Sequence, residues 1–213
     1  PYQCILHDLI TVQYAWYKAV RLCHVIKDPL LWATLAVVAI EKKQLDIAEV
    51  GLSYMDQMEK LAYISHIKNI PSIPGREAEL LVYQGKVNEA ERILLQGKLY
   101  YRAIDLHMRL FQWHKALKLA IKYKSHISTV IANRLQYYTL LNKDYQEEDE
   151  IFLQEMNKLS ISTLDDINWQ NIEQNIKNDI DQETNNTNNP NFTNRNDNNG
   201  TLNNNLLEES LDF

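Results

Sequence analysis

Histidines, cysteines and one acidic run are the side chains in this sequence whose types suit metal binding or catalysis. There are six histidines, and no two of them lie three or four residues apart, as ligands on one helix would. The acidic run from Asp144 to Glu150 is of a kind that usually faces solvent. No glycine-rich phosphate loop, HExxH motif or GxSxG motif occurs. We therefore expect no enzymatic activity, no cofactor and no bound metal.

Basic residues dominate the stretch from Lys98 to His126, and aromatic side chains are interspersed among them. Lys115, Lys118 and Lys122 recur at spacings of three and four, which places them on one face of a helix. Such a ridge suits a solvated surface, an acidic protein partner or RNA, in that order of preference. We name these three lysines as candidate partner-binding residues.

The overall composition favours a protein partner over nucleic acid or a lipid bilayer. The formal net charge is -6, which is unfavourable for binding a phosphate backbone. No apolar run approaches the roughly 18 residues that cross a membrane, so we expect no direct membrane insertion. Cys4 and Cys23 lie among apolar residues, which is typical of reduced cytosolic thiols. The sequence begins with Pro1 and not Met, which predicts that it is cut from a longer protein or processed.

The elements that position the lysines follow a pattern with a constant interval of 13 residues. Each copy has an apolar residue, an alanine three positions later and an aliphatic residue three positions after that, so all three share one helical stripe. A helix of about ten residues and a turn of about three fill the interval. Alanine in the stripe lets two helix axes approach to about 8 Å. The copies are Val87-Ala90-Ile93, Tyr100-Ala103-Leu106 and Trp113-Ala116-Leu119.

This pattern predicts an all-α fold, an α-solenoid of short antiparallel helix hairpins that is TPR-like, with a disordered C-terminal tail. Gly85 and Gly97 interrupt the pattern and suit helix C-caps. The stretch from Pro71 to Gly75 is expected to be an interhelical loop, with a helix restarting at Arg76. Gln112 is expected to be exposed.

Four segments are predicted along the chain. They are a solenoid over 1–142, an acidic linker with a short helix over 143–164, a terminal amphipathic helix over 165–183, and a disordered asparagine-rich tail over 184–213. In the terminal helix, Trp169, Ile172 and Ile176 form an apolar face. That face either caps the solenoid or docks on a partner, so its three residues are further candidate partner-binding residues.

Several stretches of the sequence resemble a known family. They are AVRLC at 19–23, LWATLAVVAI at 31–40, YISHIKNIPS at 63–72, EAERILLQGKLYYRAIDLHMRLFQWHKALKLAIKYKSHISTVIANR at 89–134 and, more weakly, INWQNIEQNIKNDI at 167–180. Together they resemble the C-terminal helical region of the intraflagellar transport protein 80 family, whose members are subunits of complex B. The resemblance covers most of residues 12–142 and does not extend to the asparagine-rich tail.

The resemblance implies a non-catalytic scaffold that follows two WD-repeat propellers. Its expected partners are other complex B subunits of the peripheral subgroup, with an indirect link to kinesin and dynein motors, and self-association is a further expectation. It implies transport along ciliary microtubules, a role in cilium assembly, and location in the cilium or flagellum and basal body with a cytoplasmic pool. A vesicle-coat subunit of the coatomer type stays open as the alternative, and an RNA-binding helical repeat is the third hypothesis. Polar base-reading side chains at fixed repeat positions, which the third would need, are missing.

Overall fold

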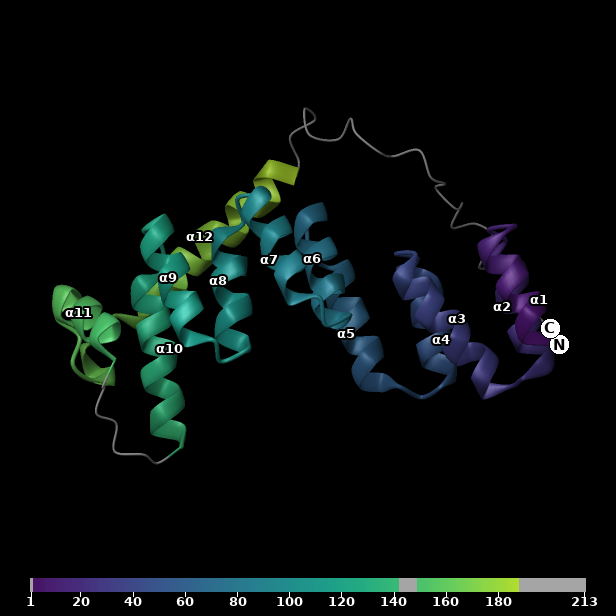
Figure 1. Ribbon diagram of the computed structural model, residues 1–213, viewed down its shortest axis with the longest axis horizontal. Helices are drawn as coiled ribbons and strands as arrows, with labels where there is room; N and C mark the ends of the chain where they lie inside the picture. Colours follow the sequence, from purple (N-terminus) through teal and green to yellow (C-terminus); the bar gives the residue numbers. More distant parts are fainter. Residues whose placement is uncertain (1, 142–148, 188–213) are drawn as a thin grey trace. The chain divides into compact units, whose positions relative to one another are not determined.

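A computed structural model describes residues 2–141 and 149–187, and all regular structure in these ranges is helical. Successive helices lie side by side, as α6 with α7 and α8 with α9 and α10 do in Figure 1. The chain divides into two compact units, Pro1–Ile167 and Asn168–Phe213. The elements are α1 (Tyr2–Thr11), α2 (Trp16–Ile26), α3 (Pro29–Glu41), α4 (Leu45–Tyr54), α5 (Met58–Lys68), α6 (Ile73–Tyr83), α7 (Val87–Gln96), α8 (Tyr100–Arg109), α9 (Trp113–Tyr123), α10 (Ile127–Leu140), α11 (Glu150–Leu159), the short 3-10 helix η1 (Leu164–Asp166) and α12 (Trp169–Thr187).

The alanine stripe is the central packing feature of the first unit. Ala90, Ala103 and Ala116 are fully buried, and each sits in the second turn of its helix. Ala90 and Ala103 belong to one hydrophobic cluster that joins α6, α7 and α8. The all-α, TPR-like fold is therefore as predicted, because the small side chain permits close approach of neighbouring helices.

One turn geometry sets the interval of the repeat. Gly85, Lys98 and Phe111 each adopt a left-handed backbone, with φ of 79°, 58° and 56°. In the turn before α8, the Leu99 amide donates to the Leu94 carbonyl at 2.9 Å and the Lys98 amide to that of Leu95 at 3.2 Å. This pair of bonds is the Schellman motif, which satisfies the last carbonyls of one helix and starts the next.

Of the two predicted C-cap glycines, only Gly85 uses the left-handed conformation. Gly97 is the C-cap residue of α7 with an ordinary φ of -75°, and Lys98 takes the left-handed position. A Cβ atom at Gly97 would lie 3.1 Å from the Pro74 Cβ. A larger side chain at 97 would therefore press against Pro74 at the start of α6, which favours glycine there.

The start of α6 differs from the prediction, and α1 is an additional helix. Ser72 caps α6 by accepting a bond from the Gly75 amide at 3.1 Å, so the helix begins at Ile73 inside the predicted loop. Pro74 fits there because the first turn of a helix needs no proline N–H. Residues 2–11, to which no helix of their own was assigned, form α1.

The terminal helix begins later and ends later than predicted. The Asp166 carboxylate accepts bonds from the amides of Ser162 and Thr163, each at 2.8 Å. These backbone bonds lower the pKa of Asp166 and hold η1 as a separate turn, so α12 starts at Trp169. Its end at Thr187 includes the first residues of the predicted disordered tail, whose remainder, 188–213, lies outside the described residues.

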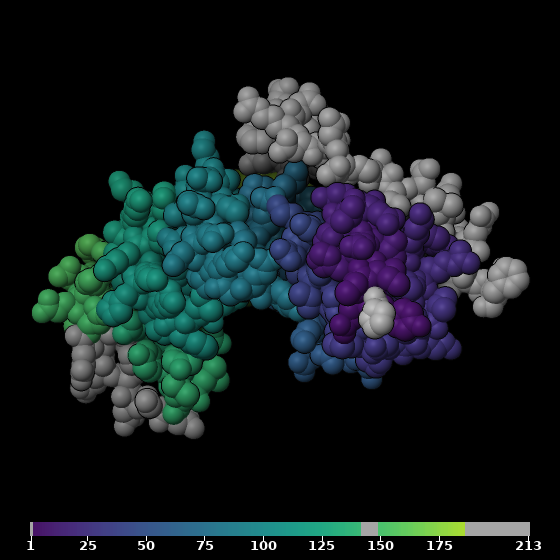
Figure 2. Space-filling view, turned by 45° about the vertical axis from the view of Figure 1, so that its right-hand side comes forward, coloured from purple at the N-terminus to yellow at the C-terminus, as the bar shows by residue number. Residues whose placement is uncertain are grey.

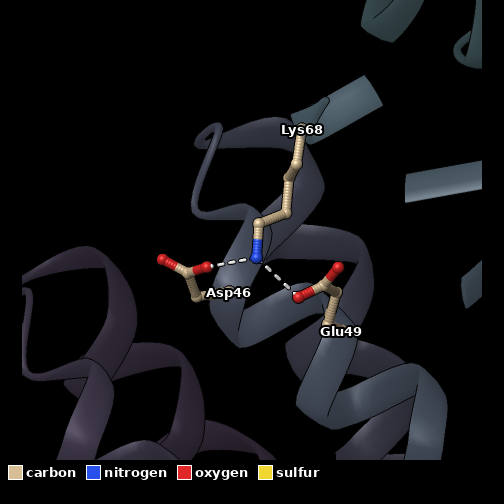
Figure 3. A network of polar contacts seen from close by, with 3 residues as sticks. All are labelled: Asp46, Glu49 and Lys68. Atoms are coloured by element: carbon tan, nitrogen blue, oxygen red, sulfur yellow. Dashed lines mark hydrogen bonds and ion pairs between the residues drawn. The ribbon is translucent and has the colours of Figure 1, made fainter. Parts of the chain in front are cut away.

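Lys68 joins α5 to α4 through two carboxylates (Figure 3). Its Nζ lies 2.6 Å from Asp46 Oδ1 and 2.7 Å from Glu49 Oε2. Desolvation alone would lower the pKa of Lys68, but these two hydrogen bonds outweigh it and raise the pKa. The network favours one register between the two helices, although exposed pairs of this kind add only about 0–1 kcal/mol each.

A buried carboxylate links three helices further along. Glu79 of α6 accepts a bond from the Tyr63 hydroxyl at 2.7 Å and pairs with Arg109 Nη2 at 2.5 Å. Arg109 Nε also lies 3.1 Å from Asp105 Oδ2. Burial, with the Glu79 contact second, raises the pKa of Tyr63, and burial raises that of Asp105. A buried charge needs such partners, so the network couples α5 to α8 across α6.

Several large apolar side chains at the start of the first unit are exposed, among them Ile5, Tyr17 and Val25. Figure 2 shows α1 and α2 in purple, continuous with the violet to blue surface of α3 and α4. Within the described part of the chain, no helix combines the length and apolar character needed to span a bilayer.

Candidate interaction surface

The three lysines predicted from the sequence form an exposed ridge on α9. Lys115, Lys118 and Lys122 all face solvent, on the side of the helix opposite the buried Ala116 and Ala120. Among the described residues, Lys115 and Lys118 take part in no ion pair. Lys122 Nζ lies 5.3 Å from the centre of the Tyr123 ring. The ridge therefore offers positive charge that the described residues leave largely uncompensated.

A pocket of about 250 Å³ opens beside the first turn of α9. Phe111 stands at its edge with 58% of its surface exposed. The Phe111 ring lies 4.9 Å from that of Tyr137 and 6.1 Å from that of Trp113, measured between centres. Lys115 belongs to both the pocket and the ridge. The lining consists of Phe111, Gln112, Trp113, His114, Lys115, Arg134 and Tyr138.

The left-handed turn before α9 holds Phe111 outward. Gly85, Lys98 and Phe111 occupy the same place in three successive turns. A left-handed backbone costs an ordinary residue roughly 1–2 kcal/mol, and glycine nothing. The sequence analysis did not predict this pocket. The 13-residue interval could have indicated it, because it places Phe111 at the turn position that Gly85 and Lys98 occupy in the two preceding repeats.

The side chain of Phe152 anchors α11 to α10. Phe152 is fully buried, and the guanidinium carbon of Arg134 lies 3.7 Å from the centre of its ring. His114 Nε2 lies 3.0 Å from Asp149 Oδ2 at the start of α11. These contacts hold α11, the predicted short helix, on α9 and α10.

His107 of α8 is buried and links the turn before α9 to α7. His107 Nδ1 lies 3.0 Å from Gln112 Oε1, and its Nε2 lies 3.1 Å from Glu91 Oε2. Gln112 is therefore half-buried and bonded, and the expectation that it is exposed was wrong. The register of the turn, which points its side chain back at α8, is the physical reason.

The apolar face predicted for the terminal helix lies in the second unit. Trp169 is 38% exposed, Ile172 only 5%, and Ile176 is intermediate. Trp169 and Ile172 are about one turn apart on α12, so the face runs from an exposed aromatic ring to a buried aliphatic side chain. Within the described residues, no group of three or more His, Cys, Asp and Glu side chains is placed to hold a metal.

Residues 31–185 match the family described as the IFT80/172/WDR35/WDR19 TPR domain. The chain belongs to this family. The ridge, the pocket and the first part of α12 all fall within the matched TPR domain. The match confirms the resemblance seen in the sequence stretches, and with them the TPR-like helical fold.

Individual relatives of this TPR domain include two intraflagellar transport proteins and a WD repeat-containing protein. The chain is 36% identical over 183 residues to the intraflagellar transport protein 80 homolog of Mus musculus, covering 86% of the chain and 22% of that protein. It is 30% identical over 91 residues to WD repeat-containing protein 35 of Rattus norvegicus, 43% of the chain and 8% of that protein. It is 28% identical over 137 residues to the human intraflagellar transport protein 172 homolog, 59% of the chain and 8% of that protein. The chain thus spans about a fifth of the first of these relatives.

Proposed function

We propose that this TPR domain is the helical part of a non-catalytic scaffold subunit of the intraflagellar transport B complex. It docks other complex B subunits, which travel along ciliary microtubules and support cilium assembly. The observation that carries the proposal is the match to an intraflagellar transport family over most of the chain. Lys115 and Lys118 support it, since both are exposed and form no ion pair among the described residues, and a solenoid works by presenting an extended surface.

The partners in this proposal are peripheral complex B subunits, and motors are reached only through the complex. The protein would then be found in the cilium and basal body, with a pool in the cytoplasm. Self-association stays a prediction. The coatomer-type coat is a weaker candidate, because it rests only on a shared solenoid architecture.

Charge reversal of the ridge tests the proposal in cells. Lys115, Lys118 and Lys122 are changed to Glu in the protein that carries this chain, expressed in ciliated cells lacking their own copy. We expect short cilia or none, and a reduced amount of the protein in purified complex B, because three contacts would become repulsive. The matched control reverses three exposed lysines outside α9, Lys18, Lys60 and Lys86.

The two variants distinguish binding through the ridge from a general effect of net charge. Normal cilia and normal complex B with the ridge variant would show that the ridge is a solvated surface. Equal defects in both variants would show that net charge alone matters. A protein that copurifies with vesicle-coat subunits and not with complex B would favour the alternative function.

A second variant addresses the terminal helix. Changing Trp169, Ile172 and Ile176 to Gln removes the apolar face while retaining most of the helical propensity of α12. We expect reduced recovery in complex B. Normal recovery would remove these three residues from the set of partner-binding candidates.

A further inference from the structure

Phe111 is an aromatic residue that its turn does not require. The equivalent positions of the two preceding turns hold Gly85 and Lys98, with nearly the same backbone geometry. A bulky side chain in this conformation is uncommon. Here it stays 58% exposed while its ring contacts Trp113 and Tyr137. An exposed aromatic side chain beside a pocket is typical of an anchor site for a protein partner.

The rings at the pocket are arranged for an inserted side chain and not for stacked bases. Phe111 and Trp113, which line the pocket, meet edge to face at 66°, and the neighbouring ring of Tyr137, outside the lining, is tilted by 45° to Trp113. Rings that meet one another at such angles leave no flat platform for successive bases. An aliphatic or aromatic side chain fills such an angular, partly apolar space well.

The lysine ridge begins at this pocket and runs along α9. Lys115 lines the pocket, and Lys122 lies seven residues further on, about 10 Å along the helix axis at 1.5 Å per residue. Acidic residues at positions i, i+3 and i+7 of a second helix span the same distance. Charge and spacing therefore match one kind of ligand, an acidic helix with an apolar residue at one end.

We propose that the pocket and the ridge together bind an acidic helical segment of a partner protein. One large apolar side chain of that segment enters the pocket beside Phe111, and its carboxylates face Lys115, Lys118 and Lys122. The inference rests on the proposed scaffold function only in taking the occupant to be a protein.

A designed peptide tests this binding mode on the full 213-residue chain. The probe is a fluorescein-labelled helical peptide of 16 residues, with Phe near one end and Glu at three positions spaced by three and four. A second peptide has the same composition with its Glu residues distributed around the helix. Fluorescence anisotropy measures binding, and we expect at least tenfold tighter binding of the patterned peptide.

Two substitution pairs assign the binding to this surface. Phe111→Asn should weaken binding at least tenfold, because asparagine fits the left-handed turn but cannot fill the pocket. Lys98→Asn makes the same backbone change one turn earlier and should leave binding unchanged. Lys118→Glu should weaken binding and reduce its salt dependence, whereas Lys60→Glu should not. Circular dichroism melting of each variant establishes that it is folded.

Each outcome decides the proposal. Equal affinity for both peptides, or unchanged binding by folded Phe111→Asn, would overturn it. Tighter binding of a 15-nucleotide single-stranded RNA would overturn it in favour of nucleic acid. A tenfold gain in peptide affinity on deletion of 188–213 would identify the chain's own tail as the occupant. If the peptide fails while the ridge variant still loses complex B in cells, the scaffold function stands and this binding mode is wrong.

Discussion

Gly51 of α4 lies directly against Ala36 of α3. A Cβ atom at Gly51 would stand 3.0 Å from the Ala36 Cβ and 3.3 Å from the Trp32 carbonyl oxygen. The two helices approach so closely here that an added methyl group would be tighter than ordinary van der Waals contact and would require its neighbours to shift. Glycine in a helix ordinarily costs about 0.5–1 kcal/mol relative to alanine, so the tight packing must offset that loss.

Gly51→Ala should therefore destabilise the fold in spite of its better helix propensity. We expect the free energy of unfolding to fall by about 1–3 kcal/mol, because the added methyl overpacks the α3–α4 contact. Urea denaturation followed by circular dichroism measures the change. Ser53→Ala, at an exposed position of the same helix, is the control and should be neutral or slightly stabilising. A more stable Gly51→Ala variant would contradict the close approach.

Ala103→Leu tests the alanine stripe. Ala103 is fully buried in the cluster between α7 and α8, so three extra carbon atoms should cost about 1–3 kcal/mol. Lys60→Leu, on the exposed face of α5, should shift the melting temperature little. Equal shifts in the two variants would show that the stripe does not form the helix crossing.

Tyr63→Phe should change both stability and its dependence on alkaline pH. Near pH 8 the loss of the bond to Glu79 should cost about 1–3 kcal/mol, because Glu79 is buried. In the folded state the pKa of Tyr63 is raised above its ordinary value of 10.0, first by burial. Its stabilising contribution is therefore complete below pH 10 and is lost as the pH rises through the folded-state pKa.

The free energy of unfolding of the parent chain should consequently fall more steeply above pH 10 than that of Tyr63→Phe. Urea denaturation at pH 8, 10 and 11 measures both curves. Tyr17→Phe, at an exposed tyrosine, serves as the reference for the other titrating groups. If the free energy of unfolding had the same pH dependence in the parent and in Tyr63→Phe, the pKa of Tyr63 would not be raised in the folded state.

Phe152→Ala should release α11 from the first unit. The ring is fully buried under the Arg134 guanidinium, so its loss should cost about 3–5 kcal/mol locally. Hydrogen–deuterium exchange should then speed up across Glu150–Leu159 while α7 and α8 stay protected. Leu153→Ala, at an exposed neighbouring position, should leave the exchange unchanged. Protection of α11 in Phe152→Ala would mean that other contacts hold this helix.

The sequence by itself determined the helices and their common packing stripe. Ala90, Ala103 and Ala116 could be assigned to helix crossings because side chains three residues apart share a helical face, and this periodicity is a local property. The lysine ridge followed from the same rule, since Lys115, Lys118 and Lys122 need only α9 to be aligned. The family resemblance depended on contiguous stretches, which are equally visible in one dimension.

Only the tertiary structure decided which residues meet between helices. Gly97 faces Pro74, and Glu79 joins Tyr63 to Arg109, although these residues lie 23, 16 and 30 positions apart. Spacing along the chain carries no information about such contacts, because they depend on the angle at which one helix crosses the next. The Phe111 pocket is of the same kind, since a left-handed turn directs one ring toward side chains of α9 and α10 that no local pattern links to it.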